Sequence, residues 1–474
     1  MYIKQIYTSC LAEASYYIES EGEALIIDPI RDSKMYLDLA KQRGAKINYI
    51  LETHFHADFI SGHLDLAKAT GAEIVFGPTA KTGYPVKVAA DRERLKLGKI
   101  EMEVLHTPGH TLESSCFLLI DELGDNHAVF TGDTLFIGDV GRPDLAIKSD
   151  LTREDLAGML YDSLHNVVLK LDDDVVLYPG HGAGSSCGKS LSSETVSTIG
   201  EQRQSNYAVQ QMSKADFVKS VTEGLLAPPP YFFNDAMMNK NGYQETEALL
   251  EASQKGLEVG AVERLMNEGV AILDVRLRDT FEKAFIPNSY HVGMEGLYAL
   301  WVGTMIPVGT KLIVVAEKGE EREAISRLAR VGHENILGYL EGGIAAWIAA
   351  GKNTDTVRSI DANQFLTEMK AGKKVLDVRK PGEVQVARVQ GSINIRLQEL
   401  ESRLDELDKS EAYLVHCAGG YRSMIAAAVL KRNGFHNITN VYKGYEGISA
   451  VEGMPLETEV CPSKLREEAL SRSK

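Results

Sequence analysis

The residues most suited to chemistry in this chain are histidines and aspartates that follow β-rich runs and stand close to glycine. They occur in four short segments, THFHAD (53–58), TPGHT (107–111), TGDTLF (131–136) and YPGHG (178–182). Neutral imidazole and carboxylate oxygens are suitable ligands for a borderline divalent metal. We therefore predict a metal centre rather than scattered loop residues. The candidate ligands are His54, His56, Asp58, His110, Asp133 and His181.

A second reactive pattern is the segment HCAGGYRS (416–423), in which Cys417 and Arg422 bound a six-residue loop between a β-rich run and a helical run. Backbone N–H groups in such a loop point to its centre, and the following helix N-terminus adds positive potential. This environment favours the thiolate of Cys417, with Arg422 helping to stabilise an anion. The residues between these two are Ala418, Gly419, Gly420 and Tyr421.

The elements that must position the metal candidates are short strands that end at polar tips. β-branched and aromatic runs predict strands over 14–20, 23–29, 48–54, 73–77, 100–110, 116–120, 127–133 and 174–181, and Gly-terminated helices over 35–44 and 65–71. Strand ends that carry His and Asp are how α/β enzymes present ligands at one sheet edge. Pro228, Pro229 and Pro230 stop regular structure, and 254–259 is predicted to be a linker.

The remainder of the chain contains an internal repeat. Residues 272–292 resemble 375–395, and residues 311–336 resemble 412–438. A period of about 100 residues, with a strand-turn-helix pattern inside each copy, predicts two tandem α/β domains and not a solenoid of short repeats.

The composition limits the classes of protein that fit. With 474 residues, 44% hydrophobic and 25% charged, the chain is globular and long enough for about three domains. A net charge of −16 argues against nucleic-acid binding and against adhesion to anionic membranes. Five cysteines without a CxxC pair favour a reducing compartment. Because we find no signal-like region and no apolar run near the ~18–20 residues of a spanning helix, we expect a cytoplasmic protein.

The N-terminal segments resemble the metallo-β-lactamase superfamily, whose first motif runs His-x-His-x-Asp-His. Phe59 stands in place of the last histidine, which helps to hold the second metal in the dinuclear zinc hydrolases of this fold. The replacement weakens a two-metal interpretation. It leaves Asp58 and His181 as ligands for a weaker second ion.

Within that superfamily, the segments 132–145, 180–190 and 228–234 resemble persulfide dioxygenases. The resemblance implies one Fe(II) per chain, with zinc as a substitute, bound by His54, His110 and Asp133. Such a ligand set leaves three coordination positions open for persulfide sulfur, O2 and water. The remaining candidates would then orient ligands or handle protons, namely His56, Asp58 and His181.

Two further residues are tentative substrate-binding candidates. Arg142 in GRPD can hold a substrate carboxylate, since guanidinium binds carboxylate bidentately. The alternative is a structural salt bridge to Asp139 or Asp144. Cys187 lies in a Gly/Ser-rich loop, where it either accepts sulfur as a pocket thiol or simply packs.

The second half resembles rhodaneses more than phosphatases, through LDVRKPGE (376–383), VQGSINI (389–395) and the length of the cysteine loop. The resemblance implies that Cys417 carries sulfane sulfur as a persulfide, while Asp377 and Arg379 set the nearby structure. In the middle copy Glu317 stands where Cys417 would be. A carboxylate cannot take up sulfane sulfur, so we expect that copy to be an inactive structural or docking domain.

The predicted fold class is multi-domain α/β: an αββα metallo-β-lactamase sandwich over 1–245, an inactive rhodanese-like domain over 258–352 and an active one over 358–460. The predicted enzyme oxidises a low-molecular-weight thiol persulfide to sulfite with Fe(II) and O2, and exchanges sulfane sulfur among persulfide, sulfite and thiosulfate in sulfide detoxification. Two alternatives stay open: a glyoxalase II-type dinuclear zinc thioester hydrolase, and a non-catalytic persulfide sensor or carrier. We also expect a homo-oligomer, either a dimer or a tetramer.

Overall fold

A computed structural model describes residues 1–145, 151–189 and 191–458. They form two compact units. Of the described residues, the first unit contains Met1–Leu249 with Ser326–His333, and the second contains Leu250–Ile325 with residues 334–458. Residues 459–460, at the end of the predicted third domain, lie outside this description. Among the described residues, no helix has both the length and the apolar character required to cross a membrane.

The first unit contains two six-stranded sheets. The first sheet has the order β1 (Tyr2–Thr8), β2 (Glu13–Ser20), β3 (Glu23–Ile27), β4 (Lys46–Glu52), β5 (Glu73–Phe76) and β6 (Lys87–Val88). The second has the order β12 (Ser197–Thr198), β11 (Val176–Pro179), β10 (Asn126–Gly132), β9 (Ser115–Ile120), β8 (Ile100–His106) and β7 (Arg94–Leu97).

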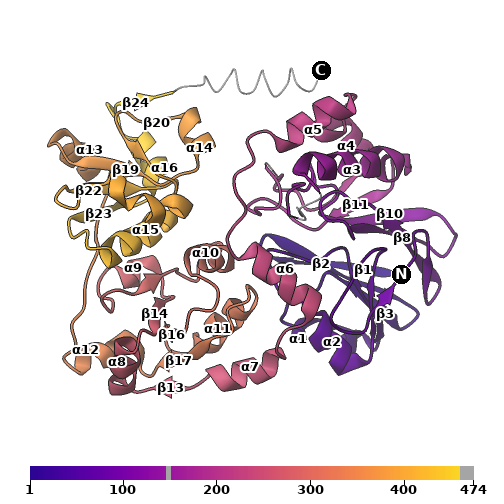
Figure 1. Ribbon diagram of the computed structural model, residues 1–474, viewed down its shortest axis with the longest axis horizontal. Helices are drawn as coiled ribbons and strands as arrows, with labels where there is room; N and C mark the ends of the chain where they lie inside the picture. The colour runs from indigo at the N-terminus through magenta and orange to yellow at the C-terminus, as the bar shows by residue number, and fades with distance from the viewer. Residues whose placement is uncertain (146–150, 190, 459–474) are drawn as a thin grey trace. The chain divides into compact units, whose positions relative to one another are not determined.

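Helices cover the outer faces of these sheets, which gives the expected αββα layering (Figure 1). They are α1 (Lys34–Arg43), α2 (His63–Thr70), α3 (Arg153–Asn166), α4 (Ile199–Ser205) and α5 (Lys214–Thr222). Two further helices follow in the chain, α6 (Phe232–Asn241) and α7 (Thr246–Ser253). Both helices predicted from the sequence are present, as α1 and α2, and each ends at a glycine in the left-handed conformation.

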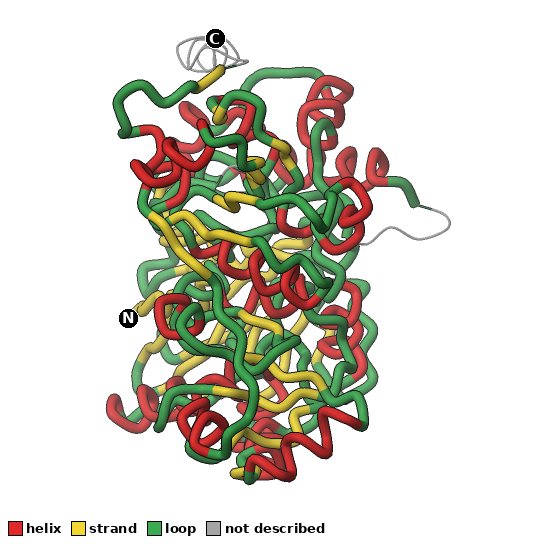
Figure 2. Tube along the Cα trace, turned by 90° about the vertical axis from the view of Figure 1, so that its left-hand side faces the viewer, coloured by secondary structure: helices red, strands yellow, loops and turns green. Residues whose placement is uncertain are grey.

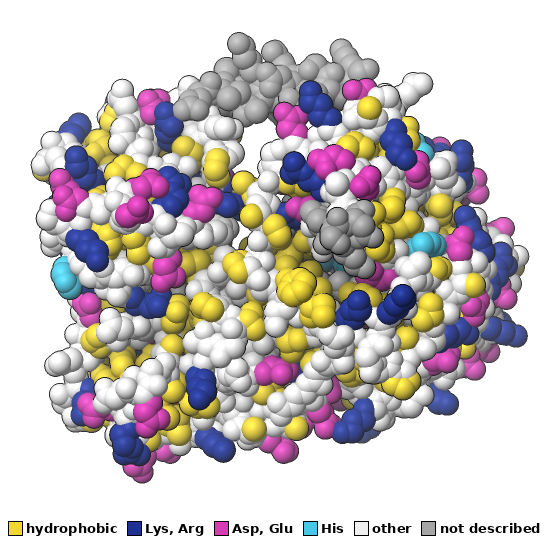
Figure 3. Space-filling model, viewed as in Figure 1, with side chains coloured by type: hydrophobic (Ala, Val, Ile, Leu, Met, Phe, Trp, Pro, Cys, Tyr) yellow, Lys and Arg dark blue, Asp and Glu magenta, His cyan; other side chains and the backbone are white. Residues whose placement is uncertain are grey.

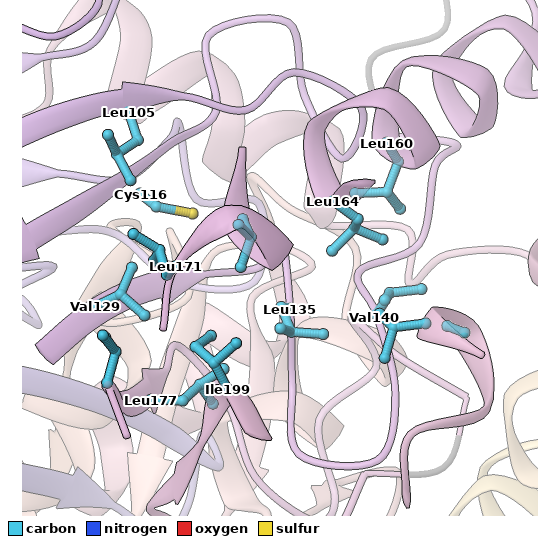
Figure 4. Packing of buried hydrophobic residues seen from close by; sticks show 14 of the residues in the cluster. Leu105, Cys116, Val129, Leu135, Val140, Leu160, Leu164, Leu171, Leu177 and Ile199 are labelled. Atoms are coloured by element: carbon cyan, nitrogen blue, oxygen red, sulfur yellow. The ribbon is translucent and has the colours of Figure 1, made fainter. Parts of the chain in front are cut away.

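Side-chain alternation along β9 explains how the layers are held together. Phe117 and Leu119 point into the core between the sheets. Cys116, Leu118 and Ile120 point to the other face, into a cluster completed by the helices (Figure 4). A strand buried on both faces reads as a continuous apolar run, and burying each large side chain contributes about 1.5–3 kcal/mol.

All eight strands predicted from the sequence are present, some shorter than expected, because the polar tips lie beyond the hydrogen-bonded ladders. The sequence did not predict β1, an edge strand with a half-buried residue pattern, nor helices α3 to α5. The predicted linker at 254–259 is wrong in part. Gly256 and Leu257 form a short strand that pairs in parallel with Tyr339 and Leu340.

The second unit contains the two repeats, each with a five-stranded parallel sheet of the same order. The middle copy has β13 (Gly256–Leu257), β17 (Ile336–Leu340), β16 (Leu312–Val315), β14 (Ala271–Asp274) and β15 (Tyr290–His291). The last copy has β18 (Arg358–Ile360), β23 (Ile438–Val441), β22 (Tyr413–His416), β19 (Lys374–Asp377) and β21 (Ile393–Asn394), beside a two-stranded sheet of β20 (Arg388–Val389) and β24 (Leu456–Glu457).

Short helices connect these strands, as the red segments between yellow strands in Figure 2 show. The helices of the middle copy are α8 (Val259–Asn267), α9 (Arg278–Phe281), α10 (Tyr298–Met305), α11 (Glu321–Ala329) and α12 (Gly343–Ala349). Those of the last copy are α13 (Ala362–Lys370), α14 (Pro381–Val386), α15 (Tyr421–Arg432) and α16 (Gly444–Ser449). The predicted tandem α/β repeat is confirmed.

Candidate metal centre and cysteine loop

Three loops at strand ends bring His54, His110 and Asp133 together. His54 follows β4 in the first sheet, while His110 and Asp133 follow β8 and β10 in the second. All three side chains are buried, and one ligand atom from each lies within 4.8 Å of the others. The Asp133 Oδ2 atom is 3.5 Å from His110 Nε2 and 4.0 Å from His54 Nε2.

Hydrogen bonds define which nitrogen of each imidazole is free. His110 Nδ1 lies 2.9 Å from the carbonyl oxygen of Arg142, which can only accept, so Nδ1 carries the proton. The Thr53 hydroxyl donates to Asp28 at 2.8 Å and lies 2.9 Å from His54 Nδ1, so it accepts from that nitrogen. Both Nε2 atoms therefore present lone pairs to the same point, as metal ligands do.

Within the part of the chain that the structure describes, the ligand atoms have no other hydrogen-bond partner. His54 Nε2, His110 Nε2 and Asp133 Oδ2 are buried and make no hydrogen bond among the described residues. Burial, assisted by His56, lowers the pKa of His54 well below its ordinary value despite Asp133. Burial would raise the pKa of Asp133, but His181, with smaller contributions from His110 and His54, outweighs it and holds that pKa below its usual range. Two neutral imidazoles and one carboxylate fit a divalent transition metal.

Close backbone approach completes this arrangement. Gly141 passes so near the site that a Cβ atom there would lie 1.9 Å from the Asp133 carbonyl oxygen and 3.0 Å from His110 Nδ1. No larger residue fits without moving a ligand. The GRPD segment therefore shapes the site in two ways. Gly141 permits the close backbone approach, and the Arg142 carbonyl oxygen accepts a hydrogen bond from His110.

The other three metal candidates lie around this triad and not within it. His181 Nδ1 is 2.8 Å from Asp133 Oδ1, and its Nε2 is 2.7 Å from Asp58 Oδ2. Burial would lower the pKa of His181, but the two carboxylates outweigh it and raise the pKa well above its ordinary value. The His56 ring lies 4.2 Å from the His54 ring, but its Nε2 meets a separate pair of carboxylates, at 3.1 Å from Asp28 and 3.5 Å from Glu52.

Cys187 lies beside Asp58 and His181, with a ligand atom from each of the three within 4.8 Å. Burial, with Asp58 and Asp133 nearby, raises the pKa of its thiol well above the ordinary value. The structure thus places Cys187 beside two of the metal candidates. A protonated thiol is a poor nucleophile, so its place favours packing over sulfur transfer in the absence of a bound ion.

The surroundings of Arg142 favour the structural alternative. Its guanidinium makes two hydrogen bonds to Asp144, at 2.6 and 2.8 Å, and others to the carbonyl oxygens of Ser186 and Leu226. A substrate carboxylate would have to displace Asp144. These contacts favour a structural role for Arg142 over substrate binding.

Four residues around the centre were not singled out from the sequence. Thr53 and Asp28 orient His54, Glu52 contacts His56, and Glu13 is buried nearby with both carboxylate oxygens unpartnered. Burial raises the pKa of Glu13 well above its ordinary value. The available signal was position, because Asp28 and Glu52 stand at the ends of apolar strands.

The cysteine loop has the predicted strand-loop-helix form, between β22 and α15. Cys417 is 1% exposed, and its sulfur accepts the Gly420 N–H at 3.1 Å. The Ser423 hydroxyl lies 3.7 Å from the same sulfur. A Cβ atom at Gly444 would lie 2.3 Å from the Cys417 carbonyl oxygen, so only glycine fits behind the loop.

Arg422 is paired with Glu383, which the sequence reasoning had not singled out. Its two terminal nitrogens each lie 2.7 Å from a Glu383 oxygen. Burial would lower the pKa of Arg422, but these hydrogen bonds raise it. The positive charge of Arg422 that could stabilise an anion on Cys417 is therefore shared with the Glu383 carboxylate.

The middle copy carries no comparable reactive group. Glu317 follows β16 as predicted, and its side chain is exposed. The buried pair of Asp274 and Arg276 repeats that of Asp377 and Arg379, with 2.6 Å between Nη2 and Oδ2 in both. These pairs are structural, as expected for Asp377 and Arg379.

Comparison with known proteins follows the same division. Residues 9–181 match the metallo-beta-lactamase superfamily, and residues 258–350 and 361–451 each match the rhodanese-like domain. A metallo-beta-lactamase structure from Staphylococcus aureus is 30% identical, with a TM-score of 0.64, covering 72% of this chain and 98% of that one. The chain belongs to the metallo-beta-lactamase superfamily and carries two rhodanese-like domains.

Curated members of the superfamily point to two activities. The chain is 35% identical to a probable hydroxyacylglutathione hydrolase of Schizosaccharomyces pombe, over 34% of this chain and 60% of that protein. It is 30% identical to the human mitochondrial persulfide dioxygenase ETHE1, over 44% of this chain and 74% of that protein. The chain spans about three fifths of the length of the first curated relatives that it matches.

Proposed function

We propose that this chain is a persulfide dioxygenase joined to a sulfurtransferase. The observation that supports the first activity is the three-ligand centre, in which His54, His110 and Asp133 converge and Phe59 takes the place of a further histidine. The Phe59 ring is fully buried and lies 4.3 Å from the His56 ring, where it offers no ligand. Similarity to human ETHE1 agrees with this assignment.

The overall reaction balances as RSSH + O2 + H2O → RSH + SO3²⁻ + 2H⁺. Ferrous iron held by the triad would supply the redox chemistry. The protein provides placement: Thr53 and the Arg142 carbonyl hold the two imidazoles, and His181 holds Asp133. Hydrogen bonds to metal-binding side chains fix their orientation, and the loss of one typically reduces metal affinity or activity by about 10–100-fold.

The second activity uses Cys417. The thiolate attacks the outer sulfur of a thiol persulfide, RSSH, whose S–S bond breaks as RSH leaves with the proton. Cys417 becomes a persulfide anion, which the Gly420 N–H can stabilise. Sulfite then attacks the outer sulfur, the S–S bond breaks, and the Cys417 thiolate leaves as thiosulfate forms. The sulfite produced by the first domain is thus a substrate for the last one, and fusion raises its effective concentration there.

Oxygen uptake tests the assignment. Protein loaded anaerobically with Fe(II) should consume oxygen when given a thiol persulfide and should release sulfite. His54→Ala should lose iron and oxygen uptake together, while His436→Ala, at an exposed histidine, should retain both. Cys417→Ser should keep oxygen uptake and lose at least about 10³-fold in sulfur transfer. Loss of oxygen uptake in this last variant would contradict the division of labour.

A second candidate is thioester hydrolysis by a two-metal centre, as the similarity to hydroxyacylglutathione hydrolases suggests. The buried group of Asp58, His181 and Cys187 could hold the second ion. Two zinc ions per chain, with hydrolysis of a glutathione thioester and no oxygen uptake, would establish this candidate and exclude the dioxygenase.

A further inference from the structure

The loop around Cys417 is contacted by the copy that lacks a cysteine. Arg278, the first residue of α9, donates from Nη1 to the Gly419 carbonyl oxygen at 3.1 Å. The Tyr421 hydroxyl donates to the Gly293 carbonyl oxygen at 2.9 Å. Both copies belong to one compact unit. The middle copy therefore supplies part of the surroundings of the reactive loop.

The contact of Arg278 is made to a peptide that also serves the sulfur. The Gly419 carbonyl and the Gly420 N–H are the two ends of one peptide group. The carbonyl accepts from Arg278, and the N–H donates to Cys417 Sγ at 3.1 Å. A charged donor on the carbonyl polarises the peptide and strengthens its N–H as a donor. It also opposes a flip that would turn the N–H away from the sulfur.

Arg278 differs from the other arginines near Cys417 in its distance from acidic groups. Arg422 has Glu383 oxygens at 2.7 Å, and Arg379 has an Asp377 oxygen at 2.6 Å. The guanidinium of Arg278 lies 3.8 Å from Asp279, and its side chain is 34% exposed. Glu295 accepts from the Arg278 backbone N–H at 3.3 Å. The Gly419 carbonyl oxygen, at 3.1 Å, is thus closer to this guanidinium than the Asp279 carboxylate is.

Other contacts brace the two copies against each other, so Arg278 is not held by its own hydrogen bond alone. The Arg432 guanidinium lies 3.5 Å from the centre of the Tyr290 ring. Lys431 Nζ lies 3.0 Å from Asp355, in the segment that joins the two copies. Removing the Arg278 side chain should therefore leave the arrangement of the two copies in place.

We propose that Arg278 is a positioning residue for the reaction of Cys417, acting through the Gly419–Gly420 peptide. The inactive copy is then a required part of the sulfur-transfer site, and not only a spacer. The inference rests on the proposed sulfurtransferase function for its biological meaning. The stabilisation of an anion on Cys417 by Arg278 can be tested without any sulfur transfer.

The experiment measures alkylation of Cys417 by iodoacetamide across pH in the full chain, by mass spectrometry of the peptide that contains it. In Arg278→Ala the midpoint of the pH profile should move up by about one pH unit, since one unit corresponds to a single modest charge-assisted interaction. Thiosulfate formation at pH 7 should fall roughly 10-fold. Arg278→Lys should recover most of the shift, and Arg278→Gln only part, because glutamine donates without charge.

Controls separate positioning from folding. Arg264→Ala, at an exposed arginine of α8, should leave the midpoint unchanged. An unchanged midpoint in Arg278→Ala, or the same shift in Arg264→Ala, would overturn the proposal. So would a lowered melting temperature with an unmoved midpoint, since that identifies a structural brace. If wild-type Cys417 forms no persulfide while the Arg278 shift is present, the proposed function fails and the positioning role stands.

Discussion

The two rhodanese-like copies share a framework and differ in the loop that follows the fourth strand of each sheet in sequence order, β16 in the middle copy and β22 in the last. Their sheets have the same strand order, and each contains an aspartate-arginine pair with the same geometry. In the last copy the loop encloses a buried sulfur; in the middle copy it carries an exposed carboxylate. Buried ion pairs thus maintain the fold independently of the loop, and chemistry depends on a few loop residues.

Breaking the shared pair should produce the largest change in stability. Asp377→Asn and Asp274→Asn each leave a buried arginine without its charge partner, and each should cost about 3–5 kcal/mol of unfolding free energy. Asp377→Asn, in the copy that holds Cys417, should also reduce sulfur transfer more than Asp274→Asn does. Chemical denaturation and thiosulfate formation measure the two effects. The control is Asp405→Asn at an exposed aspartate; a loss confined to one copy would show that the frameworks are not equivalent.

The sequence predicted this framework well because its signals are local. The repeat of Asp274 and Asp377 after apolar strands marks both copies, and glycine-ended runs mark α1 and α2. Pairings between distant residues leave no such signal. Glu383 contacts Arg422 from another helix, and the Arg278 contact joins two copies. The metal triad was found by motif. Asp28 stands at the end of an apolar strand, but its contact with Thr53, which orients His54, follows only from three-dimensional packing.

The surface illustrates the same limit of sequence reasoning. A net charge of −16 describes the whole chain, yet Figure 3 shows basic and acidic side chains interspersed over the face in view. Composition argues against strong attraction to nucleic acid. It does not locate a local charge such as that of Arg278, whose effect depends on which carbonyl it meets.

A smaller effect concerns pH, because the copies differ at a residue beside the shared pair. His291 of the middle copy lies 3.1 Å from the Asp274 carbonyl, where the last copy has Asn394 bonded to the Asp377 carbonyl at 2.9 Å. Burial lowers the pKa of His291 to about 3. In the unfolded chain this histidine has its ordinary pKa of about 6.5, so between pH 6.5 and pH 3 the unfolded chain binds a proton on His291 that the folded chain does not. The free energy of unfolding therefore decreases as pH falls from about 6.5 toward 3.

His291→Asn should therefore reduce acid sensitivity by about 2 kcal/mol between pH 7.5 and pH 5. Denaturation at the two pH values measures this, with each variant compared with itself so that any change at pH 7.5 cancels. His416 remains in the last copy, and burial lowers its pKa as well, so some acid sensitivity should persist. Equal pH dependence in variant and wild type would mean that His291 is accessible to protons in the folded chain.

The smallest expected effect comes from restoring the missing cysteine. In the last copy the left-handed residue is Gly420, at φ 93°, and its N–H meets the sulfur. Aligning the two loop arginines puts Glu320 at that position. The left-handed residue of the middle copy is instead Gly319, whose N–H donates to Glu321 at 2.8 Å. The middle loop therefore lacks the donor that the last loop aims at its sulfur.

Glu317→Cys in a Cys417→Ser background should consequently transfer sulfur at less than about a hundredth of the wild-type rate, since even one missing anion donor costs that much. Stability should change little, because Glu317 is exposed. Persulfide mass analysis at position 317 and thiosulfate formation measure the result. A matched variant that also carries Glu320→Gly and Glu321→Tyr should gain measurable transfer, because it restores the left-handed glycine and removes two negative charges. If Glu317→Cys alone were active, a cysteine would be sufficient for sulfur transfer. The backbone N–H donor near the sulfur would then not explain the difference between the two copies.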